Sequence, residues 1–294
     1  MIPRELLKRV RQIEIAARRK VTTQFAGGYL STFRGQGMEF DEVREYAPGD
    51  DIRNIDWNVT ARAGHPFIKR FVVEREMCVL LVVDISGSLG FGSGEVKKSK
   101  LVTELATLLA FLAIGNGDRV GLLLASDRVE HFIPPGNGKK HLYRVIREMF
   151  THQRQSTGTD LGAALDFACR MVPRHSTVFM VSDFLMPVEG LEKPVARLSK
   201  RHDAIAVSIS DPREMELPSM GLVRVQDPET GEVVTVDSSD PAFQRDFSAA
   251  ERQRRDAIWR LLTRHGIDRV PLSTAVSYMT PLMKFFHTRA RRLR

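Results

Sequence analysis

The sequence has 294 residues, of which 43% are hydrophobic and 27% are charged. A chain of this length and composition can bury a sizeable core in one large domain or two small ones. Residues 1–20 and residues 284–294 each carry a charge of +5, so the remaining chain carries about −2 of the net charge of +8. A groove that binds nucleic acid needs positive charge on the folded domain, whereas here the positive charge lies at the two termini. We therefore expect no specific nucleic-acid partner.

Membrane and secretion signals are missing from the sequence as well. No run approaches the roughly 18 consecutive apolar residues that a membrane span needs, and residues 1–20 lack the apolar centre of a signal peptide. We therefore expect a cytoplasmic protein without a membrane span. The two cysteines, Cys78 and Cys169, lie in apolar stretches and are interpreted as buried free thiols.

The first 75 residues differ from the rest in composition and in hydrophobic periodicity. Residues 1–20 are interpreted as a short amphipathic helix, and residues 21–75 as a β-rich appendage, because they hold glycine, aromatic and charged residues without helical periodicity. Trp57 is expected to anchor the appendage's small core. Five charged residues around it could form a docking surface, although we favour a structural role: Asp50, Asp51, Arg53, Asp56 and Arg62.

From Met77 to Ser210 the sequence alternates between strand and helix patterns. The valine-rich run Met77–Val83 has the length of a strand buried on both faces. The segments that follow in chain order are a helix in 97–115, two strands of a hairpin in 119–134, helices in 139–150 and from 161, a strand in 176–183, a helix in 191–202 and a strand in 204–210. Such alternation is typical of an α/β fold whose mostly parallel sheet has helices on both faces.

The remaining residues add a hairpin in 222–237, a helix in 240–266 and a strand in 267–274. We therefore predict three parts: a helix and β-rich appendage in residues 1–75, an α/β domain in residues 76–275 with a hairpin insertion near 221–237, and a basic C-terminal helix or tail in residues 276–294.

Polar side chains gather where the predicted strands end. The run Met77–Val83 is followed by Asp84, Ser86 and Ser88, and carboxyl ends of parallel strands are where an open α/β sheet places its site. By itself D-x-S-x-S is weak evidence for a metal site, because serine is common in the turns that follow strands. Thr159, just before a helix, and Asp183, at another strand end, would open on the same edge. Hydroxyl and carboxylate oxygens suit a hard divalent cation.

In this order, D-x-S-x-S followed by a threonine and an aspartate, the pattern resembles the metal-ion-dependent adhesion site of von Willebrand factor type A domains. The segment "FRGQGMEFDEVREYAPGDDIRNIDWNVTAR", residues 33–62, is similar to the signature of the bacterial family called domain of unknown function 58. In that family a type A-like domain with a Rossmann-like sheet follows a short β-rich region.

The resemblance implies a site for Mg²⁺, or for Mn²⁺ or Ca²⁺. Ser86 and Ser88 would be direct ligands, Asp84 would bind directly or through water, and Thr159 and Asp183 would be direct or water-bridged. An Asp or Glu of a partner protein would complete the coordination. Family members are often encoded beside MoxR-type AAA+ ATPases, which implies an adaptor or chaperone-type role for a client complex. Many members carry N-terminal membrane spans, and this sequence departs from them there.

An enzymatic alternative uses the same aspartate. The stretch "VVDISGSL" also resembles the loop of aspartyl-phosphate enzymes, in which Asp84 would attack phosphorus, Asp183 would bind Mg²⁺, and Lys193 or Lys200 would stabilise charge. Ser86, however, stands where those phosphatases place a general acid. We therefore expect a protein-binding module that is not an enzyme, with a Mg²⁺-dependent phosphohydrolase as the alternative.

Other catalytic patterns are missing from the sequence. It contains no G-x-x-x-x-G-K-[ST], H-E-x-x-H, C-x-x-C or G-x-S-x-G. The histidines His65, His131 and His175 are scattered along the chain and are interpreted as surface or packing residues.

Overall fold

The structure is a computed structural model that describes residues 38–73, 76–94, 96–227 and 231–292. The described residues fall into two compact units, a smaller one that ends at Met77 and a larger one that begins at Cys78. The helix expected in residues 1–20 lies outside the described residues.

The smaller unit holds one antiparallel strand pair with two short helices between its strands. Its elements are β1 (Met38–Glu45), η1 (Ile52–Asn54), α3 (Trp57–Ala63) and β2 (Phe67–Val73). Asp56 begins α3, because its Oδ1 accepts the backbone N–H groups of Asn58 at 3.0 Å and Val59 at 3.2 Å. Gly64 ends the helix with a φ of 77°, a left-handed conformation that favours glycine.

The prediction that Trp57 anchors a core in this unit is wrong. Trp57 is 70% exposed, whereas the strand residue Ile68 is 5% exposed. Trp57 is the first residue of a seven-residue helix in which no residue is buried, so its ring stays at the surface. Asp51 and Asp56 both cap helices, which supports the structural interpretation of these acidic residues.

The larger unit is built on a six-stranded sheet with the order β10-β7-β6-β3-β4-β5. Its strands are β3 (Cys78–Asp84), β4 (Arg119–Ala125), β5 (Val129–Gly136), β6 (Thr177–Ser182), β7 (Asp203–Ser210) and β10 (Asp268–Ser273). The pair β4–β5 is antiparallel and the other neighbours are parallel. The predicted mostly parallel α/β sheet is therefore confirmed.

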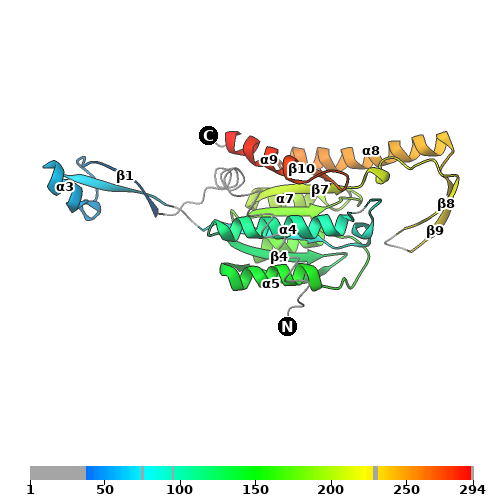
Figure 1. The fold of residues 1–294 in the computed structure, drawn as a ribbon, viewed down its shortest axis with the longest axis horizontal. Helices are drawn as coiled ribbons and strands as arrows, with labels where there is room; N and C mark the ends of the chain where they lie inside the picture. The colour runs from blue at the N-terminus through cyan, green and yellow to red at the C-terminus, as the bar shows by residue number, and fades with distance from the viewer. Residues whose placement is uncertain (1–37, 74–75, 95, 228–230, 293–294) are drawn as a thin grey trace. The chain divides into compact units, whose positions relative to one another are not determined.

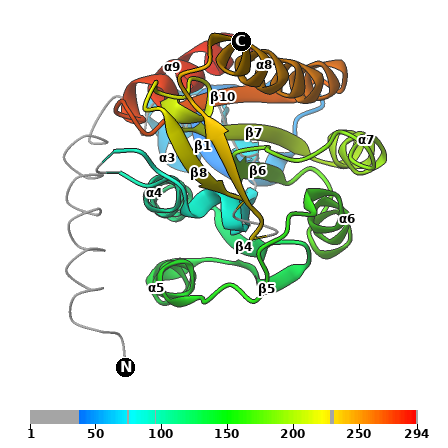
Figure 2. The ribbon, with the colours of Figure 1, turned by 90° about the vertical axis from the view of Figure 1, so that its right-hand side faces the viewer.

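Helices cover both faces of this sheet, as Figure 2 shows. On one face lie α4 (Lys98–Gly115) and α5 (Gly138–Thr151), and on the other lie α6 (Leu161–Met171) and α7 (Glu192–Arg201). Side chains of α8 (Pro241–Arg264) share one buried apolar cluster with those of α6 and α7. The sheet is thus sealed on both sides, and polar groups of its central strands meet solvent only at the strand ends.

The larger unit also contains a strand pair and a C-terminal helix, which Figure 1 labels. The predicted hairpin is formed by β8 (Leu222–Gln226) and β9 (Val233–Asp237). The last helix, α9 (Met279–Arg292), packs beside β10 and buries Leu282 and Phe286. Among the described residues, no helix is both long and apolar enough to cross a membrane.

The central strand β3 explains where a site can form. Residues Val79–Val83 are at most 3% exposed, as their apolar sequence requires. From β3 the chain builds outward through β4 and β5 on one side, and it returns to β6, β7 and β10 on the other. The order of strands therefore reverses between β3 and β6, and a crevice for ligands forms at such a switch point beside the carboxyl ends of the strands.

Candidate functional site

The two predicted aspartates lie at this switch point. Asp84 is the last residue of β3, and Asp183 follows the last residue of β6, the parallel neighbour. They are 2% and 5% exposed. Parallel pairing thus brings together two carboxyl groups that are 99 positions apart in the sequence.

The loop after β3 folds back on its own aspartate. The backbone N–H of Ser86 donates to Oδ1 of Asp84 at 2.8 Å, and the hydroxyl oxygens of Ser86 and Ser88 lie 3.1 Å apart. Ser88 belongs to a short helical turn, η2 (Gly87–Gly90), and both serines are buried. The D-x-S-x-S spacing therefore places one carboxylate and two hydroxyl groups on the same small volume.

Ser182 joins the cluster, although the sequence analysis did not single it out. Its hydroxyl donates to Oδ2 of Asp84 at 2.6 Å and accepts the N–H of Phe184 at 2.9 Å. The bond to Asp84 crosses directly from β6 to β3. Its sequence signal is its place as the last residue of an apolar strand, immediately before Asp183.

The turn after Asp183 is held in an unusual conformation. Phe184 has a φ of +55°, which bulky residues seldom adopt and which costs about 1 to 3 kcal/mol. Its ring is 2% exposed and meets the ring of Trp259 edge-on, with 5.6 Å between the ring centres. Packing thus fixes the turn that carries Asp183.

A buried lysine is the main feature that the sequence analysis missed. Nζ of Lys98, in the first turn of α4, donates to Oδ2 of Asp183 at 2.7 Å and also to Glu214. Glu214 ends the short turn η3 (Pro212–Glu214) that follows β7. The side chain of Lys98 is 0% exposed. Lys193 and Lys200, which the enzymatic alternative named, are both exposed on α7.

The electrostatics of the cluster follow from burial. Burial and then the negative charge of Asp183 raise the pKa of Asp84 to about 6, against hydrogen bonds from Ser182 and Ser86. Burial also raises the pKa of Glu214, with Lys98 acting against the rise. Lys98 thus balances charge beside Asp183 and Glu214, whereas the hydrogen bonds to Asp84 come from neutral groups.

Thr159 reaches this region through its loop. The N–H of Gly87 donates to the backbone oxygen of Thr157 at 2.8 Å, which joins that loop to the D-x-S-x-S turn. Thr159 itself is half-buried and lines a cavity of about 610 Å³ together with residues of α6 and α7. The hydrogen bonds described above link Asp84, Ser86 and Ser88 to one another and to Ser182, and Thr159 is not among the partners in those bonds.

The donor set fits a hard divalent cation. Asp84, Ser86 and Ser88 offer oxygen atoms, the kind of ligand that Mg²⁺ prefers. Asp84 is 2% exposed, and its two carboxylate oxygens accept hydrogen bonds from the neutral groups of Ser86 and Ser182. Asp183, in contrast, is already bound by the ammonium group of Lys98. An ion would therefore rest mainly on the oxygens of the D-x-S-x-S turn.

Comparisons with known proteins relate this geometry to a family. The profile of the family described as "Protein of unknown function DUF58" matches residues 42–257, which include every residue of the cluster. The uncharacterized protein Rv1480 of Mycobacterium tuberculosis is 34% identical over 289 residues, which are 98% of this chain and 90% of that protein.

Solved structures with a similar fold were also found. The conserved hypothetical protein BatB from Bacteroides thetaiotaomicron aligns with a TM-score of 0.46 at 14% identity, covering 74% of this chain and 98% of that one. A von Willebrand factor type A structure from Catenulispora acidiphila aligns with a TM-score of 0.38 at 11% identity, covering 74% of this chain and 43% of that one.

Proposed function

The chain belongs to the protein family of unknown function DUF58, and from that premise we propose that it is a metal-dependent protein-binding module of the von Willebrand factor A type. One observation carries the proposal. At the switch point of the sheet, Asp84 is buried with two serine hydroxyl groups and is hydrogen-bonded by neutral donors, while the neighbouring Asp183 is paired with Lys98.

Asp84, Ser86 and Ser88 would hold the ion, with Thr159 and Asp183 beside it. When bound, Mg²⁺ supplies an electron-poor position that accepts a carboxylate oxygen. The residues of the chain prepare this position. Ser182 holds the carboxylate of Asp84 in place, and Lys98 occupies one carboxylate oxygen of Asp183. Fewer negative ligands on the ion favour an additional carboxylate from outside.

The partner that this chemistry selects is a protein with an exposed Asp or Glu. The family resemblance adds a MoxR-type AAA+ ATPase as the candidate partner and a client complex as the object of their joint action in the cytoplasm. Both rest on the resemblance of residues 33–62 and of the D-x-S-x-S pattern, and we propose them together with the metal-dependent contact.

Binding to a purified MoxR-type AAA+ ATPase encoded in the same genome tests the proposal. We expect a chelator, Asp84→Ala and Thr159→Ala each to weaken the complex at least about tenfold, or 1.4 kcal/mol, while the circular dichroism spectrum stays native. The double variant Arg291→Ala/Arg292→Ala is the control for the basic C-terminus, because exposed charges contribute little. Binding that survives chelation but is lost in the control variant would refute the proposal.

A further inference from the structure

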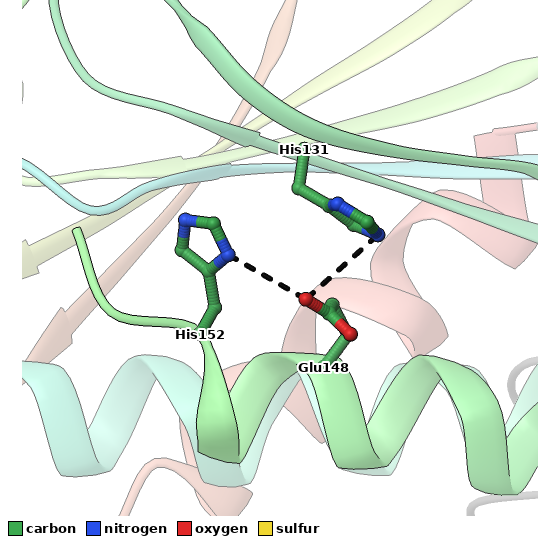
Figure 3. A group of neighbouring side chains, drawn as sticks. All are labelled: His131, Glu148 and His152. Atoms are coloured by element: carbon green, nitrogen blue, oxygen red, sulfur yellow. Dashed lines mark ion pairs between the residues drawn. The ribbon is translucent and has the colours of Figure 1, made fainter. Parts of the chain in front are cut away.

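A second group of side chains with metal-ligating atoms lies at the sheet edge formed by β5. One of its members, His152, lines a cavity of about 330 Å³ together with Asp84 and Ser86 of the strand-end cluster (Asp84, Ser86, Ser88 and Ser182). His131 belongs to β5, Glu148 to the last turn of α5, and His152 follows that helix directly. Figure 3 shows both imidazole rings turned toward the carboxylate of Glu148. One ligand atom from each of the three side chains lies within 4.8 Å of the other two. We propose that these residues bind a divalent transition-metal ion such as Zn²⁺.

The two distances that join Glu148 to the histidines are close to those of such a site. Oε1 of Glu148 is 3.8 Å from Nε2 of His131 and 3.5 Å from Nδ1 of His152. In a tetrahedral zinc site with bonds of about 2.0 to 2.1 Å, neighbouring ligand atoms are about 3.3 Å apart. The two contacts of Glu148 therefore need to shorten by only a few tenths of an ångström. Glu148 and His152 are four residues apart, which puts them on one face at the end of α5.

A buried acid orients His152 for this role. Nε2 of His152 lies 2.9 Å from Oε2 of Glu130, whose side chain is 0% exposed. The N–H groups of Gln155 and Ser156 also donate to Glu130, at 2.8 Å and 3.2 Å, so its position is fixed. A proton on Nε2 for this carboxylate leaves the lone pair of the neutral ring on Nδ1, facing Glu148. Metal-binding histidines are oriented by a carboxylate in this way.

The charges around the proposed site and the exposure of its three side chains also fit a divalent ion such as Zn²⁺. Glu130 and Glu148 together balance a dication, and neither imidazole needs a charge for the site to be neutral. The side chains of His131, Glu148 and His152 are 35%, 19% and 11% exposed, so solvent can reach a fourth position. Two imidazoles and one carboxylate suit Zn²⁺ better than Mg²⁺. The site would thus discriminate against the ion that the oxygen donors at Asp84 prefer.

A metal-free arrangement is the competing explanation. A protonated His152 between Glu130 and Glu148 would make the same contacts as an ion pair. The two explanations differ in what they predict for added metal, because a protonated His152 has no nitrogen lone pair with which to bind a metal ion.

Binding of Zn²⁺ and Co²⁺ to the chelator-treated full chain decides between them. We use the Asp84→Ala background with excess Mg²⁺, so that failure of the strand-end site does not affect the result. Calorimetry should give one equivalent of Zn²⁺, and Co²⁺ should produce the visible absorption of a nitrogen-ligated, low-coordinate ion. His131→Ala and Glu148→Gln should abolish both signals. Glu130→Gln should weaken Zn²⁺ binding about 10- to 100-fold.

His287→Ala is the matched control, because His287 is exposed on α9. It should leave the stoichiometry and the affinity for Zn²⁺ unchanged. Absence of saturable Zn²⁺ binding, or binding that His131→Ala and Glu148→Gln leave intact, would overturn the proposal in favour of the ion pair or of adventitious histidine sites.

Discussion

Nζ of Lys98 lies 2.7 Å from Oδ2 of Asp183, and the two side chains are 0% and 1% exposed. When two opposite charges are buried, their attraction offsets the free energy of desolvation only while they stay paired. The lysine also binds Glu214, so one buried cation serves two carboxylates. The contact joins the first turn of α4 to the end of β6 and makes Asp183 part of an internal ion pair.

Lys98→Met tests this pair. The substitution leaves Asp183 and Glu214 buried without their cation, and it should lower the free energy of unfolding by about 3 to 5 kcal/mol in urea titrations. Lys100→Met, on the exposed side of the same helix, should change it by no more than about 0.5 kcal/mol. Equal effects of the two substitutions would show that Lys98 does not balance charge at the site.

Asp211 gives a prediction for acid conditions. It is 0% exposed and accepts hydrogen bonds from the hydroxyl groups of Ser93 at 2.5 Å and Thr274 at 2.7 Å. Burial acts to raise its pKa, but these bonds and backbone N–H donors outweigh burial and lower the pKa from 3.8 to about 2. A lowered pKa means that the folded state holds the proton less tightly than the unfolded chain does.

The contribution of Asp211 to stability therefore amounts to about 2 kcal/mol above about pH 4, and it is lost as the pH falls toward 2. Asp211→Asn should lower the free energy of unfolding at pH 7 and flatten its decline between pH 4 and pH 2, measured by denaturant titration at each pH. Asp246→Asn, exposed on α8, is the control. An unchanged acid slope in Asp211→Asn would contradict the assignment.

The phosphohydrolase alternative predicts that Asp84 attacks phosphate esters, whereas the binding-module proposal predicts no hydrolysis. Both of its carboxylate oxygens already accept a hydrogen bond, from Ser86 and Ser182, and the residue two positions later offers a hydroxyl instead of a carboxylic acid. We expect no hydrolysis of p-nitrophenyl phosphate and no trapping by beryllium fluoride with Mg²⁺. Turnover that disappears in Asp84→Asn would make the chain an enzyme of the aspartyl-phosphate type.

Periodicity in the sequence was enough to predict the sheet. The apolar run Met77–Val83 and the helix pattern of 97–115 each match one element, β3 and α4, whose apolar residues are largely buried. Asp84 and Asp183 could be placed on one edge for the same reason, since parallel strands end together.

Contacts between distant segments left no such pattern. Lys98 stands in a run with Lys97 and Lys100 that has the appearance of a solvated helix start, and only the packing of α4 against the ends of β6 and β7 shows that one of them is buried. The prediction for Trp57 was wrong in the opposite direction. The size of its side chain predicts burial, but Trp57 begins a short helix in which no residue is buried. His131 and His152 meet only because β5 and α5 are adjacent in space.

Calorimetric titration of Mg²⁺ into the metal-free full chain tests the central claim most directly. Wild-type protein should bind one equivalent at the strand-end cluster, and saturation at 100 times the dissociation constant should stabilise the fold by about 2.7 kcal/mol. Asp84→Asn, which keeps the size of the side chain, should remove both effects, whereas Asp246→Asn should keep them. Identical Mg²⁺ binding by wild type and Asp84→Asn, or none by either, would contradict a metal-dependent site at Asp84, Ser86 and Ser88.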